Sequence, residues 1–313
     1  MYLGVKKRGI DMKIGVLTDS SAYLSKEQIN QFKNVKVVPI PIIWKNSTYY
    51  DLVNIGYEEF YEKLAQTDQL PTTSQPSLGE LKGKVDEFVN EDYTDLIVIP
   101  ISSGISSFYS SIESYVKDEE RIKIHLFDSK VTCAGLANLV MLAARITQDK
   151  NVDPVTVIKY LENLRSTIQV RFIVDDLNYL KRTGRLSNAA SFVGGLLNIK
   201  PILAMDVQGQ GKISAIAKQR QYHRAFNYIE KDFAKLTEAV TYPIYSTVFD
   251  ALDEKRKSAW LDEYRTKFPN ITFASSIIGP VVGVHVGQHA IAMIWHRNIA
   301  SYFDDKGKLL LIE

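Results

Sequence analysis

Short hydroxyl side chains recur at the ends of several apolar runs of this sequence. Thr18-Asp19-Ser20-Ser21 follows the first run, a serine-rich segment at 102–107 follows a later one, and Asp128-Ser129 follows a third. Open α/β sheets bind ligands at the carboxyl ends of their strands, where hydroxyls and helix-start amides can hold a carboxylate or a phosphate. The pattern therefore indicates an anion site, to which the hydroxyl-rich segment 72–77 adds further donors. The alternative for each residue taken alone is a helix cap.

A cation and a histidine in the second half of the chain are further candidates. Arg185, in Thr183-Gly184-Arg185-Leu186-Ser187, precedes a long apolar run at 189–203, and a cation beside such a run suits an amphiphilic ligand. His285 stands between glycines, where the backbone can approach another group closely. The alternatives are that Arg185 is a surface ion-pair partner, that the apolar run is ordinary core, and that His285 is a buried structural residue.

An enzyme is the competing class of function. Ser106 or Ser20 with His285, and with Asp19 as the third member, would make a serine-dependent hydrolase or a phosphoryl-transfer enzyme if the fold brought them together. The sequence contains no phosphate-loop motif, no dinucleotide-binding glycine motif, no HExxH and no GxSxG. Its 5 His and one Cys show no metal-ligand spacing, so we expect no metal site.

The order of apolar and amphipathic segments predicts an α/β fold in the first half. Short apolar runs at 14–17, 35–40, 96–99 and 122–127 alternate with amphipathic segments, as in βαβ units around a mostly parallel sheet with flanking helices. The run at 122–127 alternates more than the others and is expected nearer the sheet edge. Ser77 and Glu80 form a capping-box pattern for a helix that reaches about residue 90, and Asp153-Pro154 is a second helix start.

The second half predicts an α+β domain with a mixed or antiparallel sheet. Segment 199–217 reads as two strands joined by Gln208-Gly209-Gln210-Gly211, and helical patterns follow at 222–236 and 252–268. Further strands are expected at the ranges 244–249, 290–295 and 309–312. We therefore expect two domains, 1–166 and 167–313, with a ligand cleft between them and with residues 1–12 as an extension.

The composition limits the possible partners and cellular locations of the protein. The 313 residues carry 38 Lys and Arg against 36 Asp and Glu, a balance that argues against a nucleic-acid partner. Cys133 is the single cysteine and cannot form an internal disulfide, which favours a cytoplasmic location. No apolar stretch is long enough for a signal peptide or an integral membrane segment.

Taken in order, these segments resemble the DegV family of bacterial fatty-acid-binding proteins, which includes the acyl-carrying subunit of the fatty acid kinase system. The resemblance covers nearly the whole chain from Met12 onward. It depends on the order and spacing of Thr18-Asp19-Ser20, Thr73-Ser74-Gln75-Pro76-Ser77, Ser102-Ser103-Gly104-Ile105-Ser106, Phe127-Asp128-Ser129, Thr183-Gly184-Arg185-Leu186-Ser187, Leu197-Asn198-Ile199-Lys200-Pro201-Ile202-Leu203 and Gly279-Pro280 followed by Gly283-Val284-His285.

The resemblance implies a two-domain protein that buries one long-chain fatty acid, such as palmitate, stearate or oleate. Its carboxylate would lie at the domain junction and its tail in the C-terminal domain. Matched position by position, the carboxylate-binding residues would be Thr73, Ser106, Arg185 and His285, supported by Asp19, Ser20, Ser74 and Ser103.

The resemblance also implies that two different proteins bind the acid and phosphorylate it. A separate fatty acid kinase catalytic subunit would phosphorylate the bound acid, so this chain would be a lipid-binding protein without catalytic residues, metal or cofactor, and transient contact with a membrane surface fits such a role. The chain departs from the family pattern at Ile105-Ser106-Ser107-Phe108-Tyr109, at Thr183-Gly184-Arg185 and at Gly287-Gln288-His289, but the four carboxylate-binding residues are present.

Overall fold

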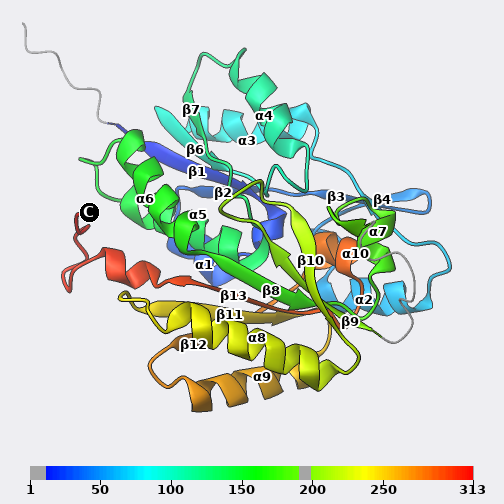
Figure 1. The fold of residues 1–313 in the computed structure, drawn as a ribbon. Coiled ribbons are helices and arrows are strands. Elements are labelled where there is room, and N and C mark those ends of the chain that lie inside the picture. The colour runs from blue at the N-terminus through cyan, green and yellow to red at the C-terminus, as the bar shows by residue number, and fades with distance from the viewer. Residues whose placement is uncertain (1–11, 190–198, 313) are drawn as a thin grey trace, which may run out of the picture.

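The computed structural model describes residues 12–189 and 199–312 (Figure 1). Its first sheet has four parallel strands in the order β2-β1-β6-β7. They are β1 (Ile14–Asp19), β2 (Val35–Val38), β6 (Asp95–Ile99) and β7 (Lys123–Leu126). The central strands β1 and β6 are buried along their whole length, whereas β7 is half-buried at the edge. The parallel sheet and the edge position of its last strand are therefore confirmed.

The second sheet has six strands in the order β10-β9-β8-β13-β11-β12. They are β8 (Gln169–Ile173), β9 (Lys200–Met205), β10 (Ile213–Gln219), β11 (Ile244–Asp250), β12 (Thr272–Ile277) and β13 (Ile291–Arg297). Every neighbouring pair is antiparallel except β11 and β12, which are parallel. The mixed sheet and the β9–β10 hairpin confirm the sequence-based prediction.

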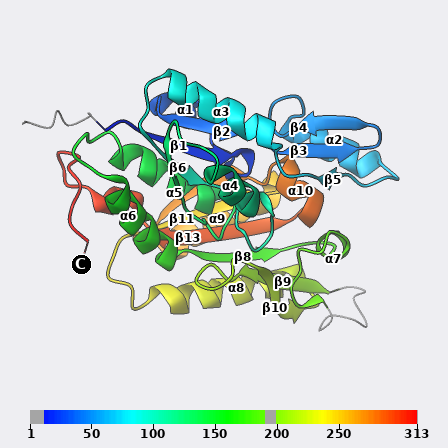
Figure 2. The ribbon, with the colours of Figure 1, turned by 90° about the horizontal axis from the view of Figure 1, so that it is seen from above.

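Helices cover both outer faces and fill the space between the sheets (Figures 1 and 2). α3 (Leu78–Asn90) and α4 (Phe108–Val116) pack on one face of the four-stranded sheet, and α8 (Tyr222–Thr237) and α9 (Glu254–Lys267) pack on the far face of the six-stranded sheet. Between the sheets lie α5 (Cys133–Ile146) and α6 (Pro154–Thr167), which share one hydrophobic core with both. That shared core couples the two halves, and a boundary at 166/167 stays a prediction.

Two helix starts follow the local rules of capping. The Ser77 Oγ accepts from the Glu80 amide at 3.2 Å while a Glu80 carboxylate oxygen accepts from the Ser77 amide at 2.7 Å. The Asp153 carboxylate accepts from the Thr156 amide at 2.8 Å at the start of α6. Both predicted helix starts are confirmed, because these side chains satisfy amides that have no partner inside the helix.

A small three-stranded sheet, which the sequence pattern did not indicate, lies beside the site described below. It contains β3 (Pro41–Trp44), β4 (Ser47–Tyr50) and the two-residue strand β5 (Thr72–Thr73) in the order β4-β3-β5. The short helix α10 (Pro280–Val286) packs against β3, β5, α2 (Tyr57–Gln66) and α7 (Asn178–Arg182). Further short elements are η1 (Ser20–Ala22), α1 (Lys26–Gln31) and η3 (Ile299–Tyr302).

One strand prediction is wrong. Residues 309–312 are not a strand, because Leu309 makes only an isolated bridge to Phe303 and the side chain of Leu311 is 97% exposed. The apolar run at 189–203 enters β9 at Lys200, and its residues 190–198 lie outside the described part of the chain. Within the described residues, no helix has the length and apolar character needed to cross a membrane.

Candidate functional site

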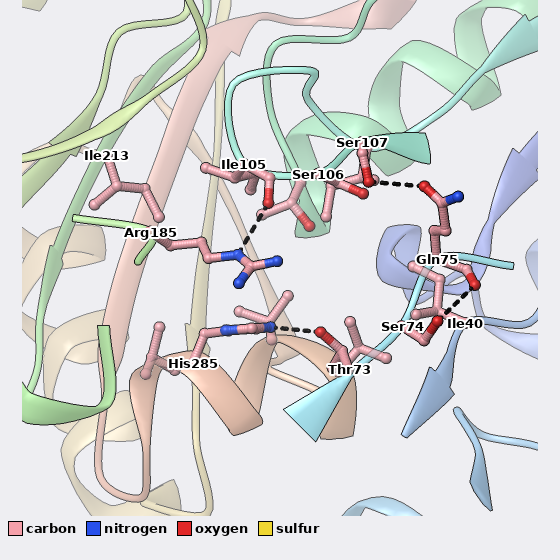
Figure 3. A pocket seen from close by; sticks show the side chains of 15 residues that line it. Ile40, Thr73, Ser74, Gln75, Ile105, Ser106, Ser107, Arg185, Ile213 and His285 are labelled. Carbon is pink, nitrogen blue, oxygen red and sulfur yellow. Dashed lines mark hydrogen bonds between the residues drawn. The ribbon is translucent and has the colours of Figure 1, made fainter. Parts of the chain in front are cut away.

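A pocket of about 80 Å³ brings four of the predicted residues together (Figure 3). Thr73 comes from β5, Ser106 from the loop before α4, Arg185 from the turn after α7, and His285 from α10. Their side chains surround the same space, and Ser74 also lines it. The four residues lie far apart in the sequence, so the pocket exists only because the sheet, the loops and α10 meet here.

His285 is held as a neutral imidazole. Its Nε2 lies 2.8 Å from the Thr73 Oγ1. Burial, and then the positive charges of Arg185 and Arg182, lower the pKa of His285 to about 3. In the described residues its Nδ1 has no hydrogen-bond partner. A neutral imidazole donates at one nitrogen and accepts at the other, so the ring joins the pocket as a hydrogen-bonding group without charge.

Arg185 supplies the charge. Gly184, at φ +70°, turns the chain after α7, and the Arg185 amide donates to the Leu180 carbonyl at 3.1 Å. The guanidinium is fixed by its Nε, which donates to the Ile105 carbonyl at 3.2 Å, and by its Nη1, which donates to the Thr183 carbonyl. Among the described lining residues it is the one charged side chain, and its Nη2 has no protein acceptor there. An unpaired guanidinium with a free donor is suited to bind an anion.

Ser106 faces Arg185 across the pocket (Figure 3). Its Oγ accepts from the Phe108 amide at 3.2 Å, which leaves the hydroxyl hydrogen able to donate. The Ser107 hydroxyl donates to the Gln75 side-chain oxygen at 2.7 Å, and this bond links the Ser106 loop to the Thr73 segment. Ser74, Gln75 and Ser107 are exposed, so this end of the pocket reaches the surface.

A small apolar cavity of about 40 Å³ lies beside the pocket. Thr132, Ile213, Val282 and Val286 line both spaces, which are therefore neighbours. The remaining lining residues come mainly from the inner face of the six-stranded sheet and are Cys133, Val170, Phe172, Met205, Phe249, Ile278, Ala292 and Ile294. The polar pocket and the small apolar cavity next to it offer the two kinds of surface that an amphiphile would contact.

Three predicted supporting residues do not line this pocket. Ser103 is exposed, and its hydroxyl and amide donate to the Asp128 carboxylate at 2.5 and 3.1 Å. Asp19 is fully buried and accepts from Ser21 and from the Ile101 amide, while the Ser20 Oγ accepts from the Ile40 amide at 3.0 Å. Their polar atoms bind other parts of the protein, and a supporting role for these three residues stays a prediction.

The geometry does not form the triad of a serine hydrolase. Ser106 and His285 line one pocket, but the hydrogen bond recorded for the His285 ring among the described residues goes to Thr73. Asp19 points its carboxylate at Ser21 and Ile101 instead of the imidazole. Within the same residues, no group of three His, Cys, Asp or Glu side chains is placed to hold a metal ion.

Sequence reasoning missed Asp51, a buried carboxyl group whose surroundings include Asp19. Burial raises the pKa of Asp51 to about 7 and that of Asp19 to about 6. Together with Ser20 and Tyr23 they line a larger groove of about 910 Å³. Asp51 follows β4 without any motif around it, so nothing in the sequence distinguishes it from a surface turn residue.

The chain is an α/β protein with a parallel four-stranded sheet and a mixed six-stranded sheet, and its Arg185 pocket lies beside an apolar cavity. A model of the family described as "Uncharacterised protein, DegV family" matches residues 13–298. Protein DegV of Bacillus subtilis is 32% identical over 285 residues, which cover 91% of this chain and 99% of that protein. A DegV domain-containing protein of Halalkalibacterium halodurans is 34% identical over 286 residues, with 91% and 98% covered. The chain belongs to the DegV family.

Solved structures agree over the same length. The crystal structure of DegV, described as a fatty acid binding protein from Bacillus subtilis, superposes with a TM-score of 0.83 at 32% identity and covers 92% of this chain and 100% of that one. The structure of a protein from Streptococcus agalactiae, described as a fatty acid binding DegV family protein, gives a TM-score of 0.84 at 28% identity, with 92% and 99% covered.

Proposed function

We propose that this protein binds one long-chain fatty acid, such as palmitate, stearate or oleate, and is not itself an enzyme. The observation that carries the proposal is that the pocket of Arg185 and a small apolar cavity lie side by side and share four lining residues. Relatives described as fatty acid binding proteins have the same fold over nearly their whole length. The carboxylate would bind to Thr73, Ser106, Arg185 and His285, with Ser74 at the rim, and the tail would follow the apolar cavity.

The tail and the head group would contribute differently. Burying roughly 15 methylenes at about 0.8 kcal/mol each gives on the order of 12 kcal/mol before the costs of association and ordering. Desolvating a carboxylate costs several kcal/mol unless it is hydrogen-bonded. The tail therefore supplies the affinity, and Arg185 with its neighbours offsets the cost of burying the carboxylate and selects an acid over an ester.

We also propose that the protein presents the bound acid to a separate fatty acid kinase catalytic subunit in the cytoplasm, with loading by transient contact at a membrane surface. The polar end of the pocket supports this, because Ser74, Gln75 and Ser107 are exposed beside it while the apolar cavity is buried. A second protein could contact a carboxylate at this opening while the acyl tail stays buried. A bulky Ser107→Trp side chain at the opening should therefore reduce acyl phosphate formation by the added kinase subunit and ATP more than it reduces acid binding.

The binding proposal is tested by denaturing extraction of the purified protein, followed by mass spectrometry of the lipids and comparison with the amount of protein. We expect near-stoichiometric free fatty acid from the unaltered protein and much less from Arg185→Ala purified in parallel. An empty extract, with no thermal stabilisation by added palmitate or oleate, would count against a carrier. Hydrolysis of a p-nitrophenyl ester that disappears in Ser106→Ala would then favour an enzyme.

A further inference from the structure

The segment that joins β1 to α1 contacts the walls of the anion pocket without lining the pocket itself. The Asp19 carboxylate accepts from the Ile101 amide at 2.7 Å, and the Ser20 Oγ accepts from the Ile40 amide at 3.0 Å. Ile101 and Ile40 both line the pocket, whereas neither Asp19 nor Ser20 is among its described lining residues. Two walls of the pocket are therefore tied to consecutive residues at the end of one buried strand.

The next residues of the segment reach two more lining residues. The Ser21 carbonyl accepts from the Thr132 hydroxyl at 3.4 Å, and the Tyr23 hydroxyl accepts from the Val282 amide at 3.0 Å. Asp51 adds a fifth contact, because its Oδ1 accepts from the Val281 amide at 3.4 Å. Thr132, Val281 and Val282 all line the pocket.

The contacts to α10 bear directly on His285. Val281 and Val282 stand in the first turn of this short helix, whose amides have no partner inside the helix. Acceptors from Asp51 and Tyr23 satisfy two of them, and the His285 ring projects from the last turn of the same helix. Tyr23 itself adopts the left-handed conformation at φ +49°, and a Cβ added to Gly279 would come within 2.2 Å of its ring. The Tyr23 ring is thus fitted closely against the start of α10.

We propose that Asp19, Ser20, Ser21, Tyr23 and Asp51 are positioning residues that hold both the Ser106 side and the His285 side of the anion pocket in register. The part of this inference that concerns acid binding rests on the proposed function. The Thr18-Asp19-Ser20-Ser21 motif thus contributes to the site through backbone amides of Ile40 and Ile101, and it does not touch the ligand. All five residues are buried, so these hydrogen bonds are shielded from competition with water.

The test uses Tyr23→Phe and Ser20→Ala, each of which removes one acceptor with little change of shape, and Tyr302→Phe as the matched control. The Tyr302 hydroxyl is also buried, but it donates to Asn163, and neither residue lines the pocket. The first readout needs no ligand and is the ¹H–¹⁵N resonance set of the His285 ring in lipid-stripped protein. The second is the ratio of Kd values for palmitate and methyl palmitate.

We expect Tyr23→Phe to shift the His285 resonances and to weaken palmitate binding about tenfold, with methyl palmitate changed by less than about twofold. Combined with His285→Gln, Tyr23→Phe should cause no further loss of acid preference, because it acts through that ring. Ser20→Ala should weaken palmitate in the same selective way through the Ile40 wall, and it carries the test if Tyr23→Phe does not fold. Tyr302→Phe should change neither readout.

Two results would overturn the inference. One is unchanged His285 resonances and an unchanged acid-to-ester ratio in the folded variants. The other is an equal loss of affinity for the acid and the ester that, in the double variant, adds fully to the loss caused by His285→Gln. A general loss of stability would produce that result. If the unaltered protein binds no palmitate, the proposed function fails, while the resonances still decide whether Tyr23 positions His285.

Discussion

Replacing Arg185 by alanine should weaken binding of a free fatty acid far more than binding of its methyl ester. Arg185 is the charged residue among the described lining residues, and its guanidinium is held by the carbonyls of Ile105 and Thr183. The variant removes the charge and the free Nη2 donor, but it leaves the apolar cavity of Phe172 and Ile294 intact. The acid and the ester share the same tail, so a difference between their losses reports on the head group.

The size of the effect follows from the kind of hydrogen bond that is lost. A hydrogen bond to a charged group contributes about 1.5 to 3 kcal/mol, which corresponds to about 10- to 150-fold in Kd. The ester carbonyl can accept from the same guanidinium, but it carries no charge, so its loss should lie at or below the lower end of that range, about 1.5 kcal/mol or about 10-fold. The acid should therefore lose roughly an order of magnitude more affinity than the ester. The carbonyls of Ile105 and Thr183 would be left facing water or each other, which adds a loss common to both ligands.

The assay is displacement of a fluorescent fatty acid by palmitate and by methyl palmitate at one pH and one ionic strength. Arg224→Ala is the matched control, because Arg224 is an exposed arginine of α8 that lies outside the pocket. It removes the same charge, and we expect both affinities to stay within about twofold. Equal losses for the acid and the ester in Arg185→Ala would refute the assignment of the carboxylate to this pocket.

Three further predictions concern the tail cavity and the titrating groups. Ala292→Leu, placed between the apolar residues Phe172 and Phe249, should weaken the acid and the ester alike in the same displacement assay, and a loss confined to the acid would contradict the tail path. Burial lowers the pKa of His285 to about 3, so the NMR resonances of its ring should show no titration between about pH 5 and about pH 8. In the unfolded chain the same histidine is protonated below its ordinary pKa of about 6.5. Its contribution to the stability of the fold is therefore lost as the pH falls from about 6.5 toward about 3. Burial raises the pKa of Asp51 to about 7. Its carboxyl therefore has no pH-dependent cost at low pH, and it lowers stability by about 4 kcal/mol in all as the pH rises from about 4 to about 7. The melting temperature of Asp51→Asn relative to the unaltered protein should therefore rise over that range, and a constant difference would contradict the assignment.

Local patterns in the sequence were sufficient to predict the strands and helices that are determined by residues close to one another in the chain. The continuously apolar runs of β1 and β6 are buried on both faces, and the Ser77–Glu80 and Asp153 caps are formed by side chains within three residues of the amides they satisfy. The strand expected at 309–312 failed for a related reason. Its apolar residues match a strand in composition, but beyond the isolated bridge from Leu309 they find no partner strand.

The site itself was only partly predictable. Thr73, Ser106, Arg185 and His285 were assigned from the family resemblance, and no periodicity in the sequence places them together. β5 is two residues long and exists because Thr73 pairs with Ile42, a contact set by tertiary structure. The role of the Ile105 carbonyl in holding Arg185 has no side-chain signature at all, since every residue carries a carbonyl. The strand-end pattern singled out Asp19 and Ser20, but it could not distinguish a ligand contact from a contact to backbone amides.

The electrostatics of the pocket are the reason why we propose an anion as its ligand. Among the described residues Arg185 forms no ion pair, and carbonyl dipoles from Ile105 and Thr183 orient its guanidinium without neutralising it. His285, beside it, is kept uncharged by burial and by the same arginine, so the pocket carries one positive charge instead of two. A partly buried cation without a counter-charge is costly, and an incoming carboxylate both removes that cost and has its own desolvation offset by the same hydrogen bonds. An uncharged head group recovers neither term. We therefore expect any selectivity for the acid to arise from a charge that the fold positions but leaves unpaired.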